Sequence, residues 1–174
     1  MTQDESARFT AGVLTLSDKG AAGQREDRSG PLIVRRLTEL GLDVRERGVI
    51  PDDPAGITAR LHEWVEMGLA LIVTTGGTGF GPRDHAPEAT RAVIEREAPG
   101  LAELMRAEGL RQTPMAALSR GVCGIARRSL IVNLPGSEKA VGENLDAIAS
   151  ILPHALQLIS GDTEHRAVPD SAES

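Results

Sequence analysis

Short apolar segments alternate with segments of helical periodicity along most of this chain. The strand-like segments cover residues 9–16, about 43–50, 69–74, about 122–126 and 129–132. The third is a continuous apolar run, which is typical of a strand buried on both faces of a parallel sheet. The last two flank a pair of arginines and are expected to form a hairpin. The pattern therefore predicts one sheet whose strands are joined mainly through helices.

Helical periodicity fills the intervals between these segments. Helices are expected at residues 32–40, between Pro54 and Gly68, at about 87–97, as short pieces at 101–108 and 114–118, and from about 138 to 159 with a break near Pro153. Asp53 is predicted to cap its helix, and Gly41 lies where a helix end favours a left-handed residue. Residues 17–30 are expected to form a long polar loop that ends in a helix start.

The alternation of strands and helices indicates an α/β fold of three layers, in which a mostly parallel sheet is flanked by helices. A length of 174 residues corresponds to about one domain. We expect a single domain over residues 9–161, a disordered N-terminus over 1–8 and a flexible polar tail over 162–174.

Composition limits the binding partners and the cellular compartment that we expect for this protein. Lys and Arg total 19 against 25 Asp and Glu, a net charge of −6 that disfavours nucleic acid. The aromatic residues are Phe9, Trp64 and Phe80, too few to form a platform for stacking bases. Cys123 is the only cysteine and is predicted to be a small buried hydrophobe. Because no signal peptide or membrane-crossing run is evident, we expect a cytoplasmic protein with no membrane partner.

Four polar loops are expected at the carboxyl ends of strands, where open α/β sheets bind their ligands. They cover residues 17–30, 51–54, 75–84 and 133–137. In the third loop, the amides of Gly76, Gly77 and Gly79 and the hydroxyls of Thr75 and Thr78 favour an anion cradle. The loop lacks the Walker A and Rossmann signatures, and taken alone it is also consistent with an ordinary tight turn.

Two acids lie in neighbouring loops. Asp52 follows the second strand and Asp84 follows the glycines, so both can reach one divalent ion that bridges nucleotide phosphates. Spacing alone leaves Asp84 equally consistent with a helix cap or an ion pair with Arg83. His85 is equally consistent with a solvent-facing loop residue and with a ligand, and His62, His154 and His165 have no metal-binding spacing. The chain lacks the pattern of a Ser-His-Asp triad.

Taken together, the loops resemble the MogA/MoaB group of molybdopterin adenylyltransferases. The resemblance rests on Thr74-Thr-Gly-Gly-Thr-Gly79, Arg83-Asp84, Pro87-Glu-Ala-Thr90, Ser119-Arg120 and Asn133-Leu-Pro-Gly136, with Ser17-Asp18, Asp27-Arg-Ser-Gly30 and Ile50-Pro-Asp52. It covers roughly residues 9–160 and is far more specific than any single motif. It implies the molybdopterin-binding fold and a step of molybdenum cofactor biosynthesis. In that step AMP passes from ATP to the terminal phosphate of molybdopterin, and pyrophosphate is released.

The resemblance also implies residue roles and partners. Asp52 and Asp84 match the acidic positions, and they would hold Mg²⁺ or orient the nucleophile. Positions that would contact the substrates are Ser17, Asp18, Asp27, Ser29, Gly30, Thr75, Gly76, Gly77, Thr78, Gly79, Arg83, Ser119, Arg120, Asn133, Pro135 and Gly136. Molybdopterin and ATP are the implied substrates and Mg²⁺ the implied cofactor. A homotrimer or larger homo-oligomer is the implied assembly, with other proteins of molybdenum cofactor biosynthesis as further partners.

Two positions depart from the commoner pattern of that group. His85-Ala86 replaces Val-Thr, which removes a hydroxyl that would cap the following helix, and Glu138 stands where proline is common. Neither change removes a matched acid or glycine. Two other functions fit the same residues: a non-catalytic carrier or assembly subunit that binds molybdopterin, and a hydrolase of another phosphoanhydride.

Overall fold

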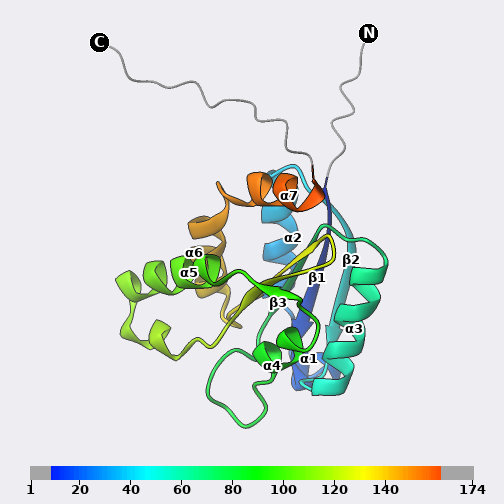
Figure 1. Cartoon of the computed structure of the whole chain (residues 1–174). Coiled ribbons are helices and arrows are strands. Elements are labelled where there is room, and N and C mark those ends of the chain that lie inside the picture. The colour runs from blue at the N-terminus through cyan, green and yellow to red at the C-terminus, as the bar shows by residue number, and fades with distance from the viewer. Residues whose placement is uncertain (1–8, 162–174) are drawn as a thin grey trace, which may run out of the picture.

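A computed structural model describes residues 9–161, which form one six-stranded sheet with helices on both faces (Figure 1). The strands are β1 (Thr10–Leu16), β2 (Asp43–Ile50), β3 (Leu71–Thr75), β4 (Arg96–Glu97), β5 (Cys123–Ala126) and β6 (Ser129–Leu134). Their order in the sheet is β2-β1-β3-β6-β5-β4. The first four in this order are parallel, and β5 and β4 are antiparallel to their neighbours. The mostly parallel sheet and the hairpin of β5 and β6 are therefore confirmed.

The helices connect these strands and continue after the last one. They are α1 (Asp18–Ala21), α2 (Ser29–Glu39), α3 (Pro54–Glu66), α4 (Ala86–Arg91), α5 (Pro99–Gln112), the 3₁₀ helix η1 (Pro114–Leu118), α6 (Glu138–Ile148) and α7 (Leu152–Ser160). Asp53 caps α3 as predicted, because its Oδ2 accepts a hydrogen bond of 2.7 Å from the amide of Gly56. Across residues 9–161, no helix combines the length and the apolar character needed to span a membrane.

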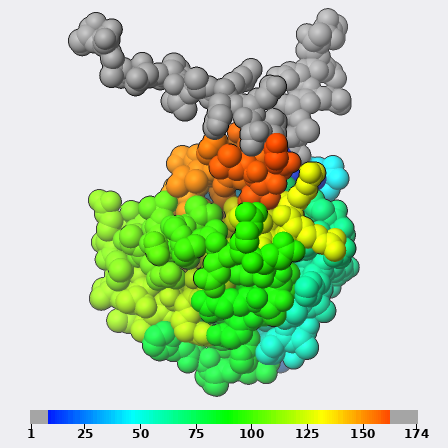
Figure 2. Space-filling view, viewed as in Figure 1, coloured from blue at the N-terminus to red at the C-terminus, as the bar shows by residue number. Residues whose placement is uncertain are grey.

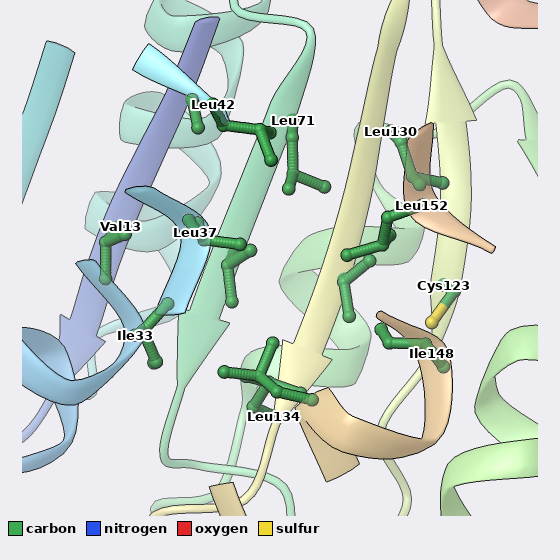
Figure 3. Close-up of a cluster of buried hydrophobic side chains, with 14 of the residues drawn as sticks. Val13, Ile33, Leu37, Leu42, Leu71, Cys123, Leu130, Leu134, Ile148 and Leu152 are labelled. Atoms are coloured by element: carbon green, nitrogen blue, oxygen red, sulfur yellow. The ribbon is translucent and has the colours of Figure 1, made fainter. Parts of the chain in front are cut away.

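The helices cover the two faces of the sheet and so produce three layers. On one face α2, α5, α6 and α7 pack through residues such as Leu37 and Ile148 (Figure 3). On the other face α3 and α4 pack through Trp64 and Ala89. Side chains of a strand alternate between the faces, so Ile72 of β3 belongs to the second cluster while both its neighbours belong to the first. The continuous apolar run of β3 is therefore buried on both sides, as predicted.

The topology leaves an opening at the carboxyl ends of the strands. From β1 the chain passes through α2 to β2 on one side, and then returns through α3 to β3 on the other side. The loops after β1 and β3 diverge, because α2, which follows β1, and α4, which follows β3, cover opposite faces. Such a switch point is where open α/β sheets bind their ligands.

Several sequence predictions of helix boundaries were wrong. The helix expected at 87–97 ends at Arg91, because the next residues pair with the sheet edge instead. Glu95 donates its amide to the carbonyl of Ile125, and β4 continues this pairing along β5. The loop expected at 17–30 contains α1, whose first turn is capped by the hydroxyl of Ser17, and α2 already begins at Ser29. The expected N-terminal segment 1–8 and tail 162–174 lie outside the described residues.

A close contact between β1 and α3 supplies a test of this packing. A Cβ atom on Gly12 would lie 2.7 Å from Cε3 of Trp64, which is fully buried. We expect Gly12→Ala to lower the free energy of unfolding by about 1–3 kcal/mol, because the core must move to accept the methyl group. In a Trp64→Leu background the same substitution should cost less. Denaturant unfolding of the four proteins measures this coupling, and an equal cost in both backgrounds would contradict it.

Candidate active site

The loops that follow β3 and β6 are joined side by side at the open edge of the sheet. The hydroxyl of Thr75 donates a 2.7 Å hydrogen bond to the carbonyl of Pro135. The hydroxyl of Ser29, at the start of α2, donates a 2.9 Å bond to the carbonyl of Gly136. Together these contacts fix residues 75–79 and 133–137 as one ridge across the end of the sheet. We call residues 75–79 and 133–137 together the glycine ridge.

The glycine ridge comes so close to the end of β1 that only glycine fits at its first turn. Gly76 has φ +95°, and a Cβ atom there would lie 2.5 Å from the carbonyl oxygen of Leu16. Its amide donates to the carbonyl of Leu134. The Gly76 amide, predicted to contact a ligand, is therefore used in this structure to hold the ridge together.

The next three amides remain available. The amides of Gly77, Thr78 and Gly79 donate no hydrogen bond to any residue between 9 and 161. Three consecutive free amides beside a turn with positive φ form a concave donor surface that suits an anion. The predicted anion cradle would therefore be formed by these three amides, one residue further toward the C-terminus than predicted.

Acidic side chains from the neighbouring loops lie beside these amides. Asp18 and Asp52 exchange hydrogen bonds, each carboxylate accepting from the other's amide at 3.0 and 3.1 Å. Arg83 donates two hydrogen bonds of 2.8 and 3.0 Å to the carboxylate of Asp18. Arg83 thus joins the loop after β3 to the loop after β1, and the bonds between Asp18 and Asp52 join the loop after β1 to the loop after β2.

The pKa values show how charge is distributed within this group. The hydrogen bond from Arg83 lowers the pKa of Asp18. Burial raises the pKa of Asp52, and the negative charges of Asp18 and Asp84 raise it further. The arginine therefore offsets the charge of one carboxylate, while Asp52 and Asp84 retain an excess of negative charge that favours a bound cation.

Asp84 is fixed by the backbone of its own loop. Its Oδ2 accepts a 2.8 Å hydrogen bond from the amide of Gly81, and a Cβ atom on Gly79 would lie 2.9 Å from the same oxygen. The helix cap considered for Asp84 is absent, because α4 starts after His85 without a side-chain cap. Asp84 also does not pair with Arg83, which binds Asp18 instead.

Residues of the glycine ridge line two cavities. The β1 cavity, about 620 Å³, is lined by Ser17, Asp27, Ser29, Thr75, Gly76 and Gly136, and also by Arg25 and Arg28. The α5 cavity, about 280 Å³, is lined by Thr78, Gly79, Ser119 and Pro135 together with apolar residues of α5 and η1. Ser137 contributes to both. The lining of the β1 cavity is more polar than that of the α5 cavity.

The comparison with known families agrees with this geometry. The family described as "Probable molybdopterin binding domain" matches residues 12–154. The chain belongs to this family. Its match runs from β1 into α7 and so includes all the loops that build the glycine ridge.

Individual relatives of this molybdopterin-binding domain support the same family assignment. The molybdopterin adenylyltransferase of Haemophilus influenzae is 39% identical over 171 residues, which cover 90% of this chain and 87% of the relative. The solved structure of the molybdopterin biosynthesis enzyme MoaB from Thermus thermophilus is 52% identical. It superposes with a TM-score of 0.84, covering 88% of this chain and 97% of that one. The resemblance inferred from the loops is confirmed.

Longer relatives contain the same domain as one part. The molybdenum cofactor synthesis protein cinnamon of Drosophila melanogaster is 44% identical over 172 residues, which cover 95% of this chain but 29% of the relative. The chain spans less than half the length of several curated relatives that it matches.

Some predicted contact residues of the molybdopterin-binding domain use their side chains internally. Asn133 is 2% exposed, and its amide group bonds Thr74, Thr90 and the backbone of Val122. We therefore correct its predicted role: the side chain holds the base of the ridge and is not directed to a ligand. Asp27 lines the β1 cavity, but both its oxygens accept hydrogen bonds, from the Gly30 amide and the Thr15 hydroxyl.

The structure also adds residues that were not among the predicted site residues. Arg25, which no motif includes, and Arg28 bring positive charge to the β1 cavity, and Glu88 forms an ion pair with Arg120. No periodicity marks these residues, because each comes from a loop or a short helix. Cys123 is buried as predicted, and burial raises the pKa of its thiol to about 12, so it is not a nucleophile at neutral pH.

The contact of Gly76 with β1 can be measured with a matched pair of substitutions. Gly76→Ala introduces both a strained positive φ and a collision with the carbonyl of Leu16. Gly23→Ala introduces only the strain, since its φ is +70° and no atom lies within 4 Å of its Cβ position. We expect Gly23→Ala to lower the free energy of unfolding by about 1 kcal/mol, and Gly76→Ala by about 1–3 kcal/mol more. Equal losses in denaturant unfolding would argue against the close contact.

The ion pair of Glu88 should be visible as a pH-dependent contribution to stability. The hydrogen bond from Arg120 lowers the pKa of Glu88 from 4.5, so the ionised form is favoured by folding. Its contribution is present above that unfolded value and is lost as the pH falls through the lower native value. Glu88 is half exposed, so we expect Glu88→Gln to reduce the free energy of unfolding at neutral pH by at most about 1 kcal/mol. Urea unfolding at neutral and acidic pH tests this, and a difference that persists in acid would contradict it.

Proposed function

We propose that this molybdopterin-binding domain adenylylates molybdopterin, transferring AMP from ATP to its terminal phosphate and releasing pyrophosphate. The observation that carries the proposal is the placement of Asp52 and Asp84 beside the free amides of residues 77–79. Two relatives from Helicobacter pylori strains, each 41% identical over 154 residues, are also named molybdopterin adenylyltransferase. The same activity is therefore the simplest assignment for this chain.

The backbone of the ridge supplies donors for the phosphate groups. Adenylyl transfer needs in-line positioning and stabilisation of negative charge more than covalent help from the protein. The amides of Gly77, Thr78 and Gly79 offer three donors that need no rearrangement before the reaction. Thr75 does not add its hydroxyl, which already donates to Pro135. Its role in the proposal is to hold the ridge in place.

The carboxylates fit a Mg²⁺ ion that would accompany ATP. Asp52 Oδ1 and Asp84 Oδ1 accept no hydrogen bond from any residue within 9–161, so each has an oxygen free for a metal. No cluster of three or more His, Cys, Asp or Glu side chains in that range is arranged as a metal site. Phosphate oxygens and water would therefore complete the coordination, as is usual for Mg²⁺, and the ion would neutralise phosphate charge.

Arg83 contributes through Asp18. Its guanidinium holds Asp18, and Asp18 in turn accepts the amide of Asp52, so the arginine fixes the loop that carries Asp52. The same positive charge lies close to the site where phosphates would bind. We assign Arg83 to positioning the acids and to balancing phosphate charge, as the family resemblance implies.

Pyrophosphate release tests the proposal directly. Purified protein is incubated with ATP, Mg²⁺ and molybdopterin, beside a reaction without molybdopterin. We expect release only when molybdopterin is present. Binding of molybdopterin without release would reject the transferase and leave a carrier or assembly subunit. Release from a phosphoanhydride in the absence of molybdopterin would instead indicate a hydrolase.

Substitution of the acids tests the assigned residues. We expect Asp84→Asn and Asp52→Asn each to lower turnover on the order of a hundredfold, because charge is lost while an amide oxygen still accepts the backbone hydrogen bond. Asp53→Asn is the matched control, because the Asp53 side chain caps α3 and asparagine caps equally well. Unchanged turnover in Asp84→Asn would remove that residue from the mechanism. The homotrimer stays a prediction, which light scattering decides.

A further inference from the structure

Arg120 makes three hydrogen bonds to the loop that carries Asp84 and one ion pair with the helix that follows it. Its amide donates a 2.8 Å hydrogen bond to the carbonyl of Thr78. In its side chain, Nε donates to the carbonyl of Gly79 and Nη2 to the carbonyl of Asp84, both at 2.7 Å. The remaining nitrogen, Nη1, pairs with the carboxylate of Glu88 in α4. These side-chain partners lie 32 to 41 residues away along the chain.

Besides Arg120, the loop is held from outside by the two hydrogen bonds that Arg83 donates to Asp18. Residues 79–84 include two glycines and Phe80, whose side chain is 70% exposed. Within the loop, Gly81 and Asp84 exchange hydrogen bonds with each other. Arg120 binds the carbonyl at each end of this six-residue segment. It therefore fixes both ends of a loop whose sequence would otherwise allow many conformations.

Arg120 is in turn anchored to the sheet. The next residue, Gly121, accepts a 2.8 Å hydrogen bond at its carbonyl from Arg106 of α5. Val122 then exchanges hydrogen bonds with the backbone and side chain of Asn133 in β6. In Figure 2 the yellow-green surface that follows α5 borders the green surface of the loop and α4. A continuous path of contacts thus connects the core strand β6, through Arg120, to Asp84.

We propose that Arg120 is a positioning residue that clamps residues 79–84 and thereby sets the place of Asp84, rather than a residue that contacts substrate. The proposal rests on the adenylyl transfer argued above for its kinetic part, and on the structure alone for the clamp. Each of the three guanidinium nitrogens donates a hydrogen bond to residues 79–88, so three of the five N–H donors of Arg120 are used to hold this segment. A planar fork is required, because a single ammonium group cannot reach two carbonyls and a carboxylate with the same geometry.

Arg120→Lys is the principal variant, and Arg127→Lys is its matched control. Both substitutions keep the positive charge and remove the planar guanidinium group. Arg127 pairs with Glu66 at 2.7 Å on an exposed surface, in the turn between β5 and β6 at the opposite end of these strands. Glu88→Gln is a milder second variant, since it removes the ion pair and leaves both carbonyl contacts of Arg120 in place. Thermal unfolding of each variant reports whether the fold is retained.

Hydrogen exchange tests the clamp without reference to activity. We expect exchange of the hydrogen-bonded amides of this loop, those of Gly81 and Asp84, to rise roughly tenfold in Arg120→Lys, and to match wild type in Arg127→Lys, because only the first variant releases the loop ends. Glu88→Gln should show a smaller rise. Exchange at wild-type rates in Arg120→Lys overturns the proposal, whatever activity the protein has.

Kinetics then separates positioning from substrate contact. We expect Arg120→Lys to lower kcat roughly tenfold to a hundredfold with little change in KM for ATP or molybdopterin, since displaced catalytic groups affect the transition state. Added guanidinium should restore part of the kcat of Arg120→Ala and none of that of Asp84→Asn. A raised KM with unchanged kcat overturns the proposal in favour of substrate contact. Wild-type protein that shows no turnover with molybdopterin rejects the proposed function, while the exchange result still decides the clamp.

Discussion

The contact between the backbone of Gly76 and the carbonyl of Leu16 determines the arrangement of the whole site. It exists because β1 and β3 are neighbours in the sheet while their connecting helices lie on opposite faces, so no helix separates the loops at their ends. The glycine turn can then lie directly against β1, and its amide reaches β6. Any side chain at this position would push the ridge away from the strand. The free amides of the next three residues would move with it.

Charge is the second constraint on this edge of the sheet. Asp18, Asp52 and Asp84 lie close enough to affect one another, which is unfavourable for a fold that binds nothing there. Arg83 stabilises one carboxylate, and two hydrogen bonds to backbone amides stabilise Asp18 and Asp52 in turn. The raised pKa of Asp52 shows that this compensation is incomplete. Uncompensated carboxylates beside free amides are the kind of unfavourable arrangement that persists at functional sites.

Sequence patterns predicted the sheet well because its signals are local. The apolar run of β3 is buried on both faces, and the cap of α3 depends on residues within one turn. The helix expected at 87–97 was predicted too long, because a distant strand, β5, satisfies the backbone of residues 95–98. The site residues also divide into those marked by local sequence patterns and those that depend on distant contacts. The loops and the acids could be found from the sequence, whereas the internal roles of Asn133 and Arg120 depend on partners more than thirty residues away.

The glycine ridge contributes residues to both cavities. Thr75, Gly76 and Gly136 line the β1 cavity, while Thr78, Gly79 and Pro135 line the α5 cavity. Of the residues with free amides, Thr78 and Gly79 therefore face the α5 cavity, where a phosphate group would meet these donors. A ridge held by many contacts keeps the donors in place without a large closing motion. The many contacts that hold it, from Ser29, Thr75 and Arg120, are therefore as important to the proposed chemistry as the acids beside it.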